Sequence, residues 1–101
     1  METWYLPNDL KFLVEITASG FSMDDNDWRV GVKCGSKIVK TYNKSECVKG
    51  EDGNWYVCIE KSILKKGEFA LIGYAEVLDP DFEDGIRSEA DKVRIGRIES
   101  I

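Results

Sequence analysis

The side chains best suited to chemistry are three cysteines, Cys34, Cys47 and Cys58, and two acidic loop segments, residues 24–27 and 79–84. A thiol becomes a useful nucleophile beside an imidazole, and loop carboxylates are ligands that Ca²⁺ prefers. The chain has no histidine. The commonest general base and the commonest metal ligand are therefore both missing.

The three cysteines are interpreted as structural residues without a metal-binding or redox role. Their number is odd and their spacing lacks the CxxC pattern of zinc and redox sites. Cys34 and Cys58 fall in apolar strand patterns, where a small buried side chain is the ordinary case. We expect reduced thiols, with a single disulfide as the alternative.

Neither acidic segment fits an EF-hand loop. The first has Arg29 at the third ligand position, and the second has Asp84 where that loop requires glycine. A looser calcium site between two loops is the alternative to plain solvated acids. We predict no metal, no cofactor and no enzymatic activity.

Composition sets the class of protein. The 101 residues are 43% hydrophobic and 33% charged, which suits one soluble globular domain spanning residues 1–101. A net charge of -5 opposes binding to nucleic acid or anionic lipid. No apolar run approaches the length of a membrane span, and residues 1–9 lack the pattern of a secretory signal. We expect a protein made in the cytoplasm.

The elements that must position these side chains are strands, because apolar residues alternate with polar ones along much of the chain. The pattern predicts strands at 10–18, 28–34, 37–42, 46–48, 55–60, 68–78 and 92–98. Residues 61–67 predict one helical or 3₁₀ turn capped by Ser62, and 79–85 predict an exposed loop. Strand 68–78 can be phased with Phe69 or with Ala70 inward, and we favour Phe69. The predicted fold is an all-β, antiparallel, immunoglobulin-like sandwich of about seven strands.

Exposed aromatic rings suggest a second class of function. Six side chains are available for stacking on sugars: Trp4, Tyr5, Tyr42, Trp55, Tyr56 and Tyr74. Trp28 and Trp55 lie on inward phases, however, and are better explained as core residues. A carbohydrate-binding or adhesin-like sandwich is therefore the alternative rather than the leading hypothesis.

Several segments occur in a familiar order. Residues 10–16 are followed by a Gly-Phe-Ser-Met-Asp loop and by strand 28–32, and residues 62–69 form a turn ending in glycine before a long strand. Residues 81–87, Asp-Phe-Glu-Asp-Gly-Ile-Arg, then precede the last strand. This order resembles that of small N-terminal β-sandwich domains in phage baseplate upper and tail-fibre proteins.

The resemblance implies a non-catalytic domain that attaches fibres or receptor-binding proteins to the particle, commonly as trimers or larger rings. It supplies no catalytic residue. The chain would be a stand-alone adaptor, a prophage remnant or a domain of a longer fibre protein. We therefore expect a virion-associated structural module, whose partners are other virion subunits and copies of itself.

The residues expected to contact partners are Tyr74, Asp81, Phe82, Arg94 and Arg97. Tyr74 is expected on an outward strand face, and Asp81 and Phe82 in the exposed loop. Lys92, Arg94 and Arg97 alternate with apolar residues, so we expect them on the solvent face of an edge strand. There they could meet the acidic loops of another subunit.

Overall fold

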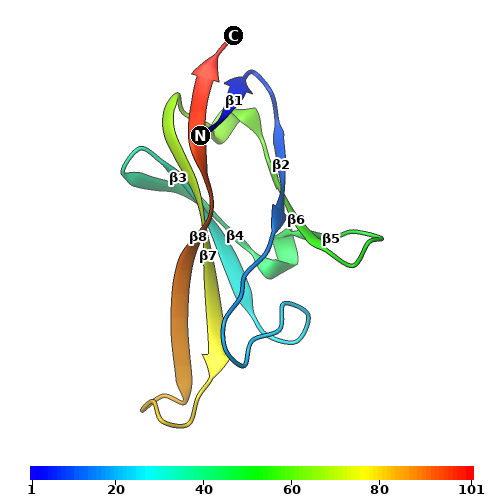
Figure 1. The fold of residues 1–101 in the computed structure, drawn as a ribbon, viewed down its shortest axis with the longest axis vertical. Helices are drawn as coiled ribbons and strands as arrows, with labels where there is room; N and C mark the ends of the chain where they lie inside the picture. Colours follow the sequence, from blue (N-terminus) through cyan, green and yellow to red (C-terminus); the bar gives the residue numbers. More distant parts are fainter.

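The computed structural model describes all 101 residues and consists of eight strands in two sheets (Figure 1). The strands are β1 (Glu2–Leu6), β2 (Leu10–Val14), β3 (Trp28–Cys34), β4 (Lys37–Asn43), β5 (Val48–Lys49), β6 (Trp55–Ile59), β7 (Gly67–Leu78) and β8 (Ile86–Ser100). Two 3₁₀ turns, η1 (Lys44–Glu46) and η2 (Lys61–Ile63), complete the secondary structure. The prediction of an all-β chain with little helix is confirmed.

The sheet order is that of an immunoglobulin-like sandwich. The larger sheet runs β1-β8-β7-β3-β4 and the smaller one runs β2-β6-β5. Neighbouring strands are antiparallel except β1 and β8, which are parallel. Strands β3, β4, β7 and β8 correspond to strands C, C′, F and G of a variable-type domain. The three cysteines are free, so no disulfide links the two sheets.

Alternation of side chains explains the core. On β3, Trp28, Val30, Val32 and Cys34 all face the smaller sheet and are buried. On β7 the inward set begins at Phe69, and its apolar members are at most 2% exposed. The outward set is less buried towards the end of the strand, where Ile72 and Tyr74 are half-buried. The favoured phase of this strand is confirmed.

Aromatic rings close one end of the sandwich. Trp4 meets Phe12 and Phe69 edge to face, with ring centroids 5.0 and 5.3 Å apart. The Trp4 ring lies against Gly96 so closely that a Cβ there would overlap it. This packing holds β1 on β8. We call the part of the sandwich around these rings the closed end.

The sequence pattern missed β1. Residues 2–6 do not alternate clearly, and their pairing depends on β8, almost one hundred residues away in the chain. Consequently the last strand is not an edge over its final third, because β1 pairs with Gly96 to Ser100. It is also longer than the predicted strand 92–98, since it begins at Ile86 and includes residues 86–89, where the sequence allows pairing to begin.

The expected position of Arg94 on the solvent face is wrong. Val93 is an extra residue in the ladder between β7 and β8, so the alternation shifts there. The Arg94 guanidinium consequently lies 5.1 Å from the ring centre of Phe12, on the other sheet, and pairs with Glu2 at 3.0 Å. A bulge of this kind redirects a side chain and leaves little sequence signal.

Three smaller predictions also differ from the structure. The first predicted strand ends at Val14 instead of residue 18, and the short strand expected at 46–48 is β5 at Val48–Lys49. Ser62 does not cap η2, which begins after Glu60 and has no side-chain cap. Leu64, just after this turn, is buried as a plug of the core.

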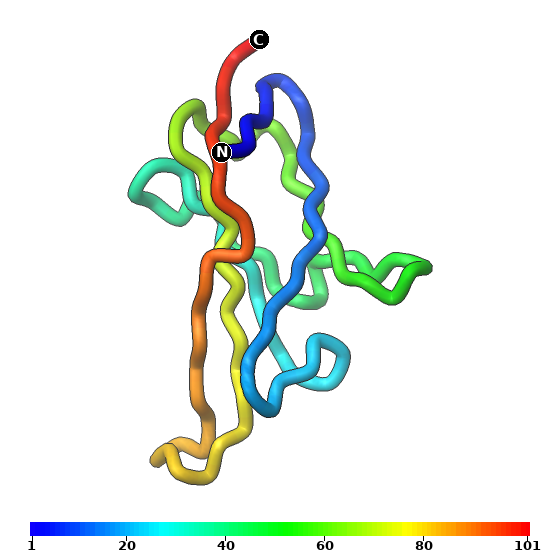
Figure 2. Tube along the Cα trace, viewed as in Figure 1, coloured from blue at the N-terminus to red at the C-terminus, as the bar shows by residue number.

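The hairpin of β7 and β8 runs past the smaller sheet, as Figures 1 and 2 show. The segment 15–27, between β2 and β3, lies beside it, and Glu76 donates its N–H to the Asp27 carbonyl. We call the outer part of this hairpin the projecting end: residues 76–78 of β7, the loop 79–85 and residues 86–90 of β8. The molecule is accordingly elongated, with extents of 49 × 33 × 22 Å.

Candidate functional site

The projecting end exposes three large apolar side chains. Leu78 is 81% exposed, Phe82 is 48% exposed and Ile86 is 38% exposed. Leu78 and Ile86 are paired across the hairpin on its outer face, and Phe82 stands in the loop between them. Apolar residues exposed together on one loop and its flanking strand ends mark an interaction site more often than isolated apolar residues do.

The loop that carries Phe82 is ordered by its own acids. Asp79 donates its N–H to the Gly85 carbonyl at 2.9 Å, and its side chain accepts from the Asp81 N–H. Asp84 accepts from the Ile86 N–H at 3.1 Å. Aspartates that bond to backbone N–H groups two residues onward are typical turn formers. The acids therefore shape this loop, and no cation is needed to hold it.

Arg87 fastens the projecting end to segment 15–27. Its guanidinium donates to Asp79 at 2.8 Å, to Glu89 at 3.0 Å and to the Ser19 carbonyl at 2.6 Å. The Asp79 side chain is only 16% exposed, so this ion pair is partly shielded from water. Charge-assisted bonds of this kind are stronger than neutral ones.

A groove of about 510 Å³ lies next to Leu78 and Ile86. It opens where β3 begins at Trp28 while β7 continues to Leu78. Its walls are residues 25–27, Arg29, Glu76 and Val77. Arg29 pairs with Glu76 at 3.4 Å and stacks over Tyr74 at 4.6 Å. The groove is thus polar on one wall and apolar at its rim, as protein-binding surfaces often are.

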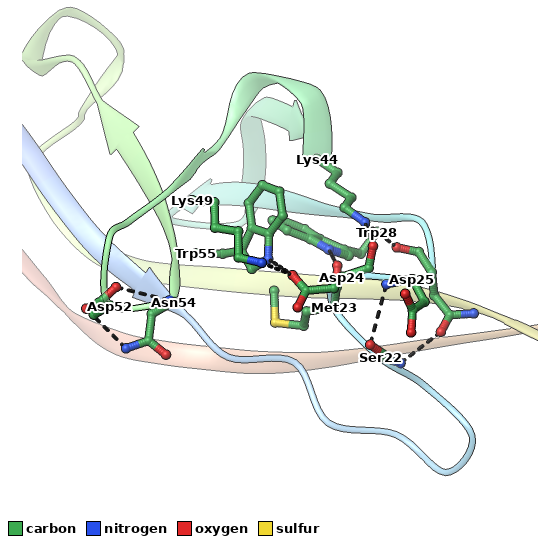
Figure 3. Close-up of polar contacts among 11 residues, drawn as sticks. Ser22, Met23, Asp24, Asp25, Trp28, Lys44, Lys49, Asp52, Asn54 and Trp55 are labelled. Carbon is green, nitrogen blue, oxygen red and sulfur yellow. Dashed lines mark hydrogen bonds and ion pairs between the residues drawn. The ribbon is translucent and has the colours of Figure 1, made fainter.

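A second hollow, of about 810 Å³, lies around Trp55, Lys44 and Lys49. Asp24 accepts from the Trp55 indole N–H at 3.0 Å and from Lys49 at 2.9 Å (Figure 3). The hydrogen bond from Lys49, followed by that from Trp55, lowers the pKa of Asp24. Lys44 donates to the carbonyls of Asp24 and Asn26. These contacts fix segment 15–27 against the smaller sheet.

The aromatic rings considered for sugar binding are mostly covered. Lys44 lies over the Trp55 ring at 5.4 Å, and Trp28 meets that ring edge-on at 5.3 Å. Lysine or arginine also lies over Tyr42, Tyr56 and Tyr74. Trp4 packs in the closed end, which leaves Tyr5, 45% exposed, with an open face. One tyrosine does not make a stacking platform.

The thiols and acids form no reactive cluster. Burial, followed by the charge of Glu46, raises the pKa of the Cys47 thiol to about 11. Cys34 is buried and Cys58 is exposed on the outer side of β6. No three of the cysteine, aspartate and glutamate side chains gather in an arrangement that could hold a metal ion.

The predicted contact residues are divided between the two ends. Tyr74 lies beside Arg29 on the outer face, and Asp81 and Phe82 are exposed in the loop of the projecting end. Arg94 lies between the sheets, and Arg97 pairs with Glu99 beside β1. The sequence reasoning missed Leu78 and Ile86. Their signal is an apolar residue on the outward phase at each end of the 79–85 loop.

None of the helical elements is long and apolar enough to cross a membrane. No family model matches the chain, and no curated protein or solved structure matches it.

Proposed function

We propose that this chain is a non-catalytic assembly module of a phage or prophage particle, which docks other subunits through its projecting end. The observation that carries the proposal is the exposed group of Leu78, Phe82 and Ile86 beside a half-polar groove. The link to baseplate or tail-fibre attachment comes from the resemblance in segment order described above.

The position of this group within the fold supports a docking role. In variable-type immunoglobulin domains the B–C and F–G loops lie at one end and bind the antigen. The equivalent segments here are 15–27 and 79–85, which are fastened together by Arg87. This argument rests on a similarity of fold alone. The exposed apolar group supports the proposal independently.

A binding experiment with tail proteins tests this function. The chain is mixed with the tail, baseplate or fibre subunits encoded beside its gene, and complexes are detected by size-exclusion chromatography with light scattering. We expect one such complex, and the double variant Leu78→Ser, Phe82→Ser should weaken it at least tenfold because buried apolar anchors dominate interface energies.

Val48→Ser is the matched control, because Val48 is 49% exposed, as Phe82 is, but lies on β5 of the other sheet. The proposal fails if none of these subunits binds, or if Val48→Ser weakens the complex as much as the double variant does.

A further inference from the structure

The projecting end contains an unpaired strand edge. β1 covers β8 only from Gly96 onward, so residues 86–92 have β7 on one side and no strand on the other. The Asp79 N–H bonds to the Gly85 carbonyl, which fixes the alternation of this antiparallel ladder. It follows that the N–H and C=O groups of Ser88 and Ala90 point away from β7, towards the open edge. The Ile86 carbonyl does so too, while its N–H is bonded to the Asp84 side chain.

Two of the other edges are protected against the addition of a further strand. β4 carries Lys37 and Lys40 and has a bulge opposite Val32 and Lys33, and β5 has only two residues. Lysines, bulges and short length are the usual means of preventing strand addition. On β8, the outward-facing residues next to Ile86 are the small Ser88 and Ala90, and the bulge comes only at Val93.

We infer that two copies of this chain pair through this edge, antiparallel and about a two-fold axis at Ser88. This inference deepens the proposed assembly function and rests on it. In that register Ser88 exchanges both backbone hydrogen bonds with Ser88 of the second copy, and the Ile86 carbonyl accepts from the Ala90 N–H. The two larger sheets then form one continuous sheet.

The charges select this register. Arg87 of each copy lies opposite Glu89 of the other. If the two-fold axis is moved from Ser88 to residue 87, the two Arg87 side chains lie opposite one another. If it is moved to residue 89, the two Glu89 side chains do. Like charges directly opposite one another destabilise a sheet, and opposite charges stabilise it. Arg87 has five N–H donors, of which three are used within the chain, so it can also bond to the partner's Glu89.

The same register places the loop of one copy beside the basic part of β8 in the other. The loop ends where β8 begins at Ile86, which pairs with Ala90, so the acidic loop of one copy lies next to Lys92 of the other. Residues of the projecting end and of the last strand, which lie apart within one chain, would thus approach each other between chains. The self-paired edge leaves the groove wall of Arg29 and Glu76 available for another subunit.

Proline substitution tests the edge. Ser88→Pro removes the N–H at the two-fold axis, and proline is tolerated on a strand whose N–H faces solvent. Ser88→Ala is the matched control, because it loses the same hydroxyl bond to Glu76 but keeps the N–H. Light scattering over a wide concentration range should show dimers for the natural chain and for Ser88→Ala, and monomers for Ser88→Pro.

A charge reversal tests the register without risk to the backbone. Lys92→Glu places a negative charge beside the acidic loop of the other copy at two symmetric positions and should weaken the dimer about tenfold. Lys37→Glu, an equal charge change on β4, should have no effect.

A natural chain that stays monomeric overturns the self-pairing, while binding of tail subunits separately decides the proposed function. Dimers that persist in Ser88→Pro, or that respond equally to Lys37→Glu and Lys92→Glu, also overturn it. If Ser88→Pro does not fold, the charge variants decide.

Discussion

The closed end and the projecting end share strands β7 and β8 but use them differently. At the closed end the two strands are covered by β1 and by the smaller sheet, and Trp4, Phe12 and Phe69 fill the space between. At the projecting end the same hairpin has only segment 15–27 against its inner face, and Leu78, Phe82 and Ile86 remain exposed. One hairpin therefore supplies core at one end and an accessible surface at the other.

The comparison indicates that the residues that stabilise this fold are different from the residues exposed to a partner. The apolar burial that stabilises the domain is concentrated where two layers meet. Exposed apolar residues add little to folding, so their presence on a loop and its flanking strand ends, held in place by Arg87, requires another explanation, and contact with a partner provides one.

The largest expected effect is on the free energy of unfolding, and replacing phenylalanine by alanine at each end of the molecule distinguishes the two ends. Phe69→Ala should lower the free energy of unfolding by about 4 kcal/mol, because it empties a site where the ring is 2% exposed. Phe82→Ala, in the exposed loop, should change it by less than about 0.5 kcal/mol. Urea unfolding followed by tryptophan fluorescence measures both. Similar losses in the two variants would mean that the projecting end is also part of the core.

A smaller effect is expected where segment 15–27 is fastened to the hairpin. Arg87→Ala should lower stability by about 1 to 2 kcal/mol and should speed amide exchange in residues 15–27, because three charge-assisted bonds are lost. Arg97→Ala is the control, since its guanidinium makes one exposed pair with Glu99, and it should cost less than about 0.5 kcal/mol. Unchanged exchange in 15–27 would show that this segment is held by other contacts.

The smallest effect is a local dependence on pH where segment 15–27 meets the smaller sheet. Hydrogen bonds from Lys49 and Trp55 lower the pKa of Asp24 below its ordinary value of 3.8. The stabilisation is therefore present above that value and is lost as the pH falls through the lowered pKa. The fluorescence of Trp55 should change in this acidic range in the natural chain, while Asp24→Asn should show no such step. An identical acid titration in both proteins would rule out this contact as its cause.

The sequence allowed the two-layer architecture to be predicted, because strands such as 28–34 and 68–78 carry their inward and outward faces in a regular alternation. β1 was not predictable in this way, since its pairing with β8 depends on a tryptophan packing against a distant glycine. Arg94 was misplaced because a bulge at Val93 reverses the alternation without a distinctive residue type.

The candidate site was partly predictable. The 79–85 loop with Asp81 and Phe82 was apparent from its composition, and its exposure is confirmed. Leu78 and Ile86 were missed because a single apolar residue at the end of a strand has the same sequence signal whether it is buried or exposed. The open edge at residues 86–92 could not be predicted, because it exists only where β1 stops short along β8.

Hydrogen exchange of the assembled protein, compared with that of the dilute single chain, tests the central claim most directly. Assembly here means either the self-associated protein or its complex with a tail subunit. The account predicts that newly protected amides are confined to residues 76–92, at the projecting end. New protection at β4 or around Trp55, with residues 76–92 exchanging as before, would contradict it.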